Sequence, residues 1–417
     1  MDFILIQFLN GLASASSLFL VASGLSIIFG VTRIVNFAHG SFYMLGAYLA
    51  YSAVEQLPRS PLGFWAGIAV AALIVGVIGV VMEIALLRRL YRAPELFQLL
   101  ATFGVVLVIA DLTLKIWGAE DLLAPRPPGL RGAVEIAGHA FPKYDLLLIA
   151  IGPMVLAALW LLFHRTRWGS LVRAATQDRD MVSALGVNQR RLFTGVLFLG
   201  SLLAGLGGAL QLPREAANLQ MDLAIIAEAF VIVVVGGMGS IGGAYVAALL
   251  VALLQAFGIV VFPKITLVLI FMVMALVLAV RPYGLFGRPL AEPHRTGAVL
   301  AEEALGAERR LTRHWLAIAV AALILLPPLL GGYVVVVLTE IVILALFAAS
   351  LHLMMGPGGM ASFGHAAFFG IGAYGAALAA HDLGAPMLLA IAAAPVAAAA
   401  LAVLCGWFCV RLSGVYL

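Results

Sequence analysis

Few side chains in this chain of 417 residues could do chemistry, and most of them stand singly within long apolar runs. Asp111 and Lys115 are four residues apart, so they can pair along one face of a helix. Glu228 and Glu340 have no partner nearby in the sequence, and a carboxylate inside a membrane is a candidate for a substrate or proton role. The alternative is a position near a membrane face, where the charge costs little. No close Asp, His and Glu set or Ser and His set is visible, so the sequence does not predict an enzyme.

Two further patterns have a chemical and a structural interpretation. Cys405 and Cys409 lie one helical turn apart and could bind a metal, but no His or acidic residue is near them, which favours apolar packing. The glycine-rich stretch from Gly236 to Ala244 lacks the Lys and Ser/Thr of a phosphate-binding loop. It predicts tight helix packing or a break in a helix.

Two histidines occupy matching positions in separate parts of the chain. Asn36 precedes His39 by three residues, and Ser362 precedes His365 in the same way. We expect both pairs at the cytoplasmic edge of equivalent helices. Asn36 or Ser362 can cap the following helix, with a hydrogen-bonded histidine beside it. The alternative is that these four residues belong to a translocation pathway or gate.

The elements that position these residues must be membrane helices, because 64% of the residues are hydrophobic and 11% are charged. Backbone groups in lipid must pair within their own segment, so we predict an all-α, polytopic transmembrane bundle. Two spans are short and could be re-entrant or broken, namely 39–55 and 222–238. The expected spans are 8–29, 39–55, 63–87, 96–117, 145–163, 193–211, 222–238, 243–262, 264–280, 315–331, 333–355, 364–380 and 386–410.

Arginines gather in three clusters, around residues 88–92, 165–191 and 281–313. An even number of expected spans separates each cluster from the next, so all three can be cytoplasmic, as the positive-inside rule requires. Three spans precede the first cluster, which places the amino terminus in the periplasm. The modest net charge of +4 does not suggest a nucleic-acid partner.

An internal repeat organises the chain. Gly30 to Tyr48 aligns without a gap to Gly356 to Tyr374, so that a His, two Phe and a Tyr match at the same separation of 326 residues. We therefore predict two membrane modules in parallel orientation, at 1–281 and 314–417, joined by a cytoplasmic linker at 282–313. The second module is shorter after the motif, from which we expect a truncated copy or a fragment.

The charged loop from Arg165 to Phe193 predicts one short helix. Gly186 ends this helix, and its apolar stripe consists of Leu171, Ala174, Ala175, Met181, Val182 and Leu185. An interfacial helix resting on the bilayer is one interpretation. A docking helix for a cytoplasmic partner is the other, because the helix carries both charge signs.

Four separated motifs give a family resemblance: VTRIVNFAHGSFYMLGAY, RAATQDRDMVSALGV, GGMGSIGGA and RPYGLFG. Together they resemble the permease subunits of branched-chain amino-acid ABC importers, with the first permease fused to the start of the second. The resemblance implies that the loop is the coupling helix that contacts an ATPase. Its candidate residues are Arg173, Ala174, Ala175, Asp178, Asp180 and Gly186; the candidate pathway or gate residues are Asn36, His39, Ser362, His365 and Glu228.

The resemblance also implies partners and a location. We expect two cytoplasmic ABC ATPase subunits that bind ATP and Mg, a periplasmic solute-binding protein, membrane lipid, and a pseudo-dimer of the two modules or a dimer with another permease. The chain itself is expected to bind no cofactor and no metal and to lie in the bacterial inner membrane. A sugar or nucleoside permease of the same superfamily, and an ion-coupled secondary transporter, remain as alternatives.

Overall fold

The computed structural model describes residues 2–287 apart from 59, 92, 94, 137 and 262, then 314, 318, 320, 321, 323 and 327, and finally 331–356 and 364–409. The chain divides into two compact units, Met1–Ala291 and Glu292–Leu417. Nearly all of the span expected at 315–331, most of the linker, and Ser362 therefore lie outside the described residues.

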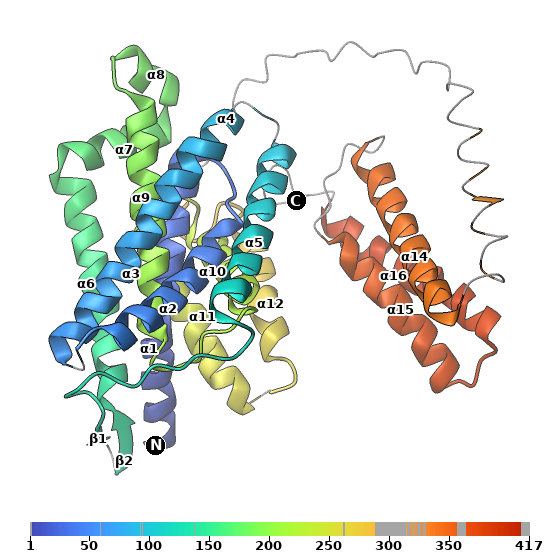
Figure 1. Cartoon of the computed structure of the whole chain (residues 1–417), viewed down its shortest axis with the longest axis horizontal. Coiled ribbons are helices and arrows are strands. Elements are labelled where there is room, and N and C mark those ends of the chain that lie inside the picture. The colour runs from blue at the N-terminus through green and yellow to red at the C-terminus, as the bar shows by residue number, and fades with distance from the viewer. Residues whose placement is uncertain are drawn as a thin grey trace. The chain divides into compact units, whose positions relative to one another are not determined.

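Unit 1 is a bundle of helices, as its composition predicts (Figure 1). Its helices are α1 (Asp2–Thr32), α2 (Ala38–Gln56), α3 (Pro61–Met82), the π-helical turn η1 (Glu83–Leu87), α4 (Arg88–Leu90), α5 (Glu95–Trp117), α6 (Lys143–Arg165), α7 (Arg167–Gln177), α8 (Arg179–Ala184), α9 (Gln189–Gln211), α10 (Met221–Gly236), α11 (Ile241–Val261) and α12 (Thr266–Val280). The expected spans thus match observed helices within a few residues. One antiparallel hairpin, β1 (Ala133–Ile136) and β2 (His139–Pro142), was not expected.

Many of these helices can cross a membrane. Among the described residues, eight are long and apolar enough: Phe3–Thr32, Pro61–Leu90, Phe97–Trp117, Lys143–Arg165, Gln189–Gln211, Ile241–Val261, Gly332–Met355 and Met387–Trp407. The protein is therefore a multi-pass membrane protein with an all-α bundle.

The core of unit 1 forms around α1, which packs against α6, α9, α10 and α11. Small residues let the backbones approach closely. A Cβ atom at Gly46 of α2 would lie 2.2 Å from the carbonyl oxygen of Gly205 of α9, and one at Gly208 would lie 1.9 Å from the carbonyl oxygen of Tyr43. Only glycine fits at these crossings of α2 and α9.

Helix α2 begins inside the bundle and not at its edge. The ring of His39 contacts the carbonyl of Val21, about three turns before the end of α1, and the Phe37 amide donates to Thr102, about two turns into α5. At 1.5 Å per residue, both contacts place the start of α2 about 10–16 Å inside the helix ends. The expected position of His39 at the cytoplasmic edge is therefore wrong. None of the irregular residues 33–36 that lead there is exposed: Ile34 and Asn36 are buried, and Arg33 and Val35 are half-buried, as expected where lipid cannot satisfy the backbone.

Both short spans prove to be continuous helices. Helix α2 is unbroken over 19 residues and mostly buried in protein. Helix α10 runs over 16 residues and ends where Gly237 takes a φ of 98°. A Cβ atom at Gly236 would lie 2.5 Å from the backbone of Gly243, so the glycine cluster provides both a helix break and tight packing, as expected. Residues 285 and 286 then hydrogen-bond to the end of α10.

The two ends of unit 1 differ in what they carry (Figure 1). Helices α4, α7 and α8 lie at one end of the bundle, while the amino terminus and the β1–β2 hairpin lie at the other. The arginines at 88–89 and 165–191 consequently share one end, as the span count requires.

Unit 2 repeats the first three helices of unit 1. Adding 326 to the bounds of α1, α2 and α3 gives, within a few residues, α14 (Gly332–Met355), α15 (His365–His381) and α16 (Met387–Cys409). The correspondence extends to side chains. His39 lies against Val21 and Gly24 of α1, and His365 lies against Phe347 and Ser350, which are their counterparts.

Candidate functional site

The charged loop folds as two helices, and the prediction of a single helix is wrong. Asp178 has φ −147° and ψ 104°, which separates α7 from α8, and its Oδ1 accepts the Met181 amide at 2.9 Å. Asp178 is thus the N-cap of α8. Gly186 ends the segment at a φ of 80°, a conformation that favours glycine.

The expected apolar stripe is also divided. Of its residues, Ala175 and Val182 are buried against the bundle, together with the neighbouring Val172, whereas Leu171, Met181 and Leu185 are exposed, Leu185 by 76%. Arg173, Ala174 and Asp178 are exposed with the second group. The side chain of Asp180 lies outside the described residues. The α7–α8 segment, residues 167–186, therefore presents an exposed apolar and charged surface at the end of the bundle.

The inner side of the α7–α8 segment is packed onto several helices. Gly169 lies so close to α6 that a Cβ atom there would be 2.3 Å from the Leu162 carbonyl oxygen. The ring of Trp168 lies 5.8 Å from that of Phe163. Thr176 approaches both Gly30 at the end of α1 and Gly239 in the α10–α11 turn. The segment is therefore in direct contact with α1, α6 and this turn.

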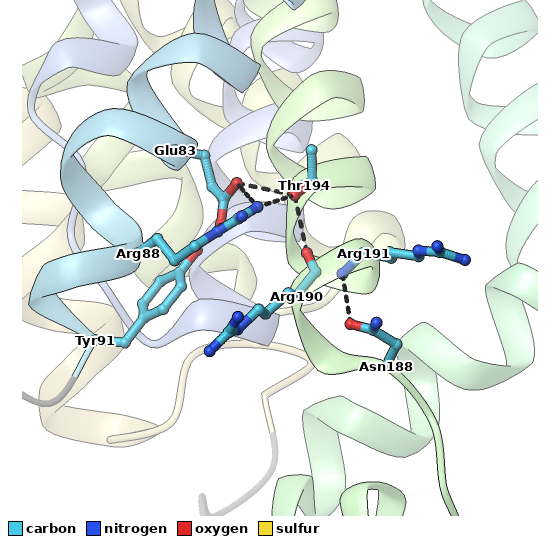
Figure 2. Close-up of polar contacts among 7 residues, drawn as sticks. All are labelled: Glu83, Arg88, Tyr91, Asn188, Arg190, Arg191 and Thr194. Atoms are coloured by element: carbon cyan, nitrogen blue, oxygen red, sulfur yellow. Dashed lines mark hydrogen bonds and ion pairs between the residues drawn. The ribbon is translucent and has the colours of Figure 1, made fainter.

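A buried carboxylate links α3 to α9 near the same end (Figure 2). Glu83 is fully buried in η1, and its ion pair with Arg88 is 2.9 Å long. Tyr91 donates to Glu83 Oε1 at 3.1 Å, and Thr194 of α9 donates to Oε2 at 2.8 Å. Arg88 also donates to Thr194 at 3.0 Å. The donors on Arg88, Tyr91 and Thr194 compensate the buried charge of Glu83. The bond from Thr194 also connects the end of α3 to α9.

The candidate gate residues Asn36 and His39 are fully buried. Asn36 Oδ1 accepts the Ala38 amide at 3.1 Å. Phe37 is the N-cap residue of α2 and no side chain caps this helix, so the expectation that Asn36 is its N-cap is wrong. His39 Nε2 lies 2.9 Å from the Val21 carbonyl oxygen. Asn36 Nδ2 and His39 Nδ1 have no partner among the described residues. In unit 2, His365 is half-buried, and its Nε2 lies 2.7 Å from Ser350 Oγ.

The other buried acidic residues were missed in the sequence. Asp222, in the first turn of α10, accepts from Ser41 of α2 at 3.2 Å. Asp145, in the first turn of α6, forms a 3.2 Å ion pair with Arg214 after α9. Their position in a first turn, where the helix dipole favours an acid, was the available signal.

The carboxylates singled out in the sequence behave differently. Glu228 is half-buried and accepts from Gln255 of α11 at 2.7 Å, a partner too distant in sequence to be foreseen. Glu340 is exposed on α14 of unit 2. Asp111 and Lys115 are both exposed on α5 and form no ion pair among the described contacts, so the expected pairing is wrong. Cys405 is a free thiol on α16.

Comparison with known proteins bears on both units. The family described as "Branched-chain amino acid transport system / permease component" matches residues 7–278 and 333–417. The two matches fall in units 1 and 2 respectively, as a repeat requires. No solved structure matches the chain.

Curated relatives carry the same description. The high-affinity branched-chain amino acid transport system permease protein BraD of Pseudomonas aeruginosa is 29% identical over 69% of this chain and 96% of its own length. LivH of Escherichia coli K12 is 26% identical over 69% of this chain and 96% of its length. LivM of the same strain is 27% identical over 67% of this chain and 70% of its length. The chain therefore belongs to the family of branched-chain amino acid transport permease components, and it contains two modules of that family.

Proposed function

We propose that this chain forms the membrane pathway of an ATP-driven importer for branched-chain amino acids, in which separate subunits hydrolyse ATP. The relatives are named permeases of such a transport system, which supports the substrate class. The observation that carries the mechanism is the α7–α8 segment, which exposes Leu171, Met181 and Leu185 at the arginine-bearing end of the bundle. Exposed apolar side chains in that position favour a protein partner.

In this proposal, two cytoplasmic ABC ATPase subunits carry ATP and Mg, and one of them contacts Arg173, Ala174 and Asp178. Ala175 is buried and holds the segment to the bundle. Asp180 completes the proposed surface, and Gly186 ends it. A periplasmic solute-binding protein delivers the amino acid at the opposite end. The chain acts in the bacterial inner membrane, either as a pseudo-dimer of its two modules or with another permease.

The test is reconstitution of the full chain with its ATPase and binding protein in proteoliposomes, followed by uptake of labelled leucine. We expect uptake that requires ATP and continues after an ionophore collapses ion gradients. Uptake that follows the gradient would support a secondary transporter instead. Uptake of a sugar or nucleoside in place of leucine would support a related permease.

Docking is tested separately with a matched pair of exposed leucines. Leu185→Gln should weaken co-purification of the ATPase, because it places a polar group on the proposed contact. Leu62→Gln, which changes an 82% exposed leucine at the start of α3, should leave co-purification unchanged. Equal ATPase recovery with both variants would rule out the α7–α8 segment as the docking surface.

We also propose that Asn36, His39 and Glu228, together with Ser362 and His365 of the second module, belong to the pathway or its gate. Polar groups without partners at the start of α2, well inside the bundle, support this placement. Glu228→Gln can keep the hydrogen bond to Gln255 while it removes the charge. We expect uptake to fall about tenfold, the effect of about 1.4 kcal/mol, with unchanged thermal unfolding. Normal uptake would exclude Glu228 from the pathway.

A further inference from the structure

A cavity of about 270 Å³ lies where four parts of unit 1 meet. The end of α1, the end of α6, the middle of α7 and the turn between α10 and α11 form its walls. Its polar lining includes Ser26, His164, Arg173, Thr176 and Ser240, and no Asp or Glu is among the described residues that line it. The charge of the lining is therefore positive, which favours an anion.

Ser26 on the wall of this cavity has an unused hydroxyl. It is fully buried, and its Oγ has no hydrogen-bond partner among the described residues. Two other buried hydroxyls of α1 are satisfied within the helix: Ser23 donates to the Leu20 carbonyl and Thr32 donates to the Ile28 carbonyl. A buried hydroxyl that makes no such bond calls for a partner in the cavity.

The amino terminus of α11 also opens into the cavity. Ser240 Oγ accepts the Gly243 amide at 3.1 Å, and the Ser240 carbonyl accepts the Ala244 amide. Ile241 and Gly242 line the cavity, and their amides belong to the first turn, which has no intrahelical acceptors. Nothing lies within 4 Å of the position that a Cβ atom would take at Gly242. These amides and the dipole of a 21-residue helix suit a phosphate oxygen.

The position of the cavity along α6 indicates that such a phosphate belongs to a lipid headgroup. Trp160 lines the cavity five residues before the end of α6, about 8 Å from that end, and stacks on His164. An exposed Trp at that depth is typical of the lipid headgroup region. Leu156 and Ile27 add an apolar wall, and the neighbouring Met154 and Leu161 of α6 are exposed. The opening is therefore bordered by lipid as well as by water.

We propose that this cavity binds the phosphate of an anionic phospholipid, with the headgroup on the Ser26 hydroxyl, Arg173 and the α11 amino terminus, and the acyl chain along α6. The site joins α7 to α1 and to the α10–α11 turn, so a bound lipid connects them. This inference requires only that the protein spans the membrane, and it is independent of the transported solute.

The experiment uses the full chain in nanodiscs that contain phosphatidylglycerol. After transfer to detergent, the retained phosphatidylglycerol is measured by mass spectrometry. Ser26→Ala removes the hydroxyl, and Gly242→Val fills open space over the α11 amides. We expect each change to lower retention about tenfold, the effect of one lost charge-assisted hydrogen bond. Gly104→Val, on the exposed surface of α5 where a Cβ atom also meets nothing within 4 Å, is the matched control.

The outcomes separate the possible ligands. Retention by wild type and Gly104→Val, with loss in the two cavity variants, supports the proposal. Displacement of phosphatidylglycerol by inorganic phosphate would show a site for free phosphate and overturn the assignment to lipid. Equal retention in all variants would overturn the site itself. If Ser26→Ala has a higher melting temperature and retains the same amount of lipid, Ser26 is only an unsatisfied hydroxyl and the proposal is overturned. If the ATPase displaces the retained lipid, the cavity belongs to the ATPase contact and the assignment to lipid is overturned.

Discussion

At the scale of single residues, the buried acids hold unit 1 together through long-range contacts. Glu83 pairs with Arg88 five residues later, and it also accepts a hydrogen bond from Thr194 of α9, 111 residues later. Asp222 reaches Ser41 of α2 in the same manner. Because each carboxylate is surrounded by donors, removing one donor leaves part of a buried charge uncompensated.

Replacement of Thr194 tests this interpretation. Thr194→Val keeps the shape of the side chain but removes the 2.8 Å hydrogen bond to Glu83, and we expect it to lower the free energy of unfolding by about 1–3 kcal/mol. Thr194→Ser keeps the hydroxyl and should remain close to wild type. Thermal unfolding of the purified protein in detergent measures both. Identical unfolding of the two variants would show that the hydroxyl contributes little.

At the scale of elements, close helix crossings depend on glycine in unit 1 but not at the equivalent place in unit 2. A Cβ atom at Gly46 would clash with α9. At Gly372, its counterpart 326 residues later, the nearest atom to such a Cβ is the Ala394 carbonyl oxygen at 3.6 Å, an ordinary contact. The described part of unit 2 contains counterparts of α1 to α3 only, so α15 meets no equivalent of α9 there.

This difference predicts unequal effects of the same substitution. Gly46→Ala must push α2 away from α9, and we expect it to lower the free energy of unfolding by about 1–3 kcal/mol. Gly372→Ala should have almost no effect. The amount of monodisperse protein in size-exclusion chromatography and its melting temperature measure the two changes. A larger loss with Gly372→Ala would mean that α15 packs against an additional element as closely as α2 does.

The α7–α8 segment offers a second prediction at this scale. Asp178→Ala removes the cap of α8, which costs about 0.5–2 kcal/mol of helix stability, and should lower co-purification of the ATPase. Asp178→Asn can accept the same hydrogen bond from Met181, and we expect it to restore binding. If Asn binds the ATPase as poorly as Ala, the negative charge itself must contact the partner.

At the scale of the whole molecule, the distribution of arginines predicts that opposite ends of unit 1 face opposite sides of the membrane. The α7–α8 segment lies at one end and the β1–β2 hairpin at the other (Figure 1). The arginines at the first end predict that it is cytoplasmic. The parallel orientation that the repeat predicts would have α14 cross in the same direction as α1.

Cysteine labelling tests this topology. In a chain with Cys405 and Cys409 replaced by Ala, Leu185→Cys should react with an impermeant maleimide only in inverted vesicles. Val134→Cys, at an exposed position of β1, should react only in intact cells. The reverse pattern would place the α7–α8 segment in the periplasm and would exclude its contact with an ATPase.

The sequence by itself determined the fold class, the repeat and, within a few residues, the boundaries of those spans that the structure describes. Lipid requires each span to be a continuous helix of sufficient length, and this requirement is local, so composition and periodicity report it. The match of His39 and Phe42 to His365 and Phe368 likewise needed only alignment. Gly236 to Ala244 marked a helix end because glycine permits the positive φ observed at Gly237.

Only the tertiary structure decided which polar groups are buried together and how deep they lie. The depth of His39, the partner of Glu228 and the enclosure of Glu83 all depend on contacts between helices that are distant in the sequence. The break at Asp178 could not be predicted from periodicity, which favours one continuous helix. In the structure, Ala175 and Val182 are buried against the bundle from two separate helices. Membrane helices are apolar on most faces, so their sequences indicate poorly which face meets protein and which meets lipid.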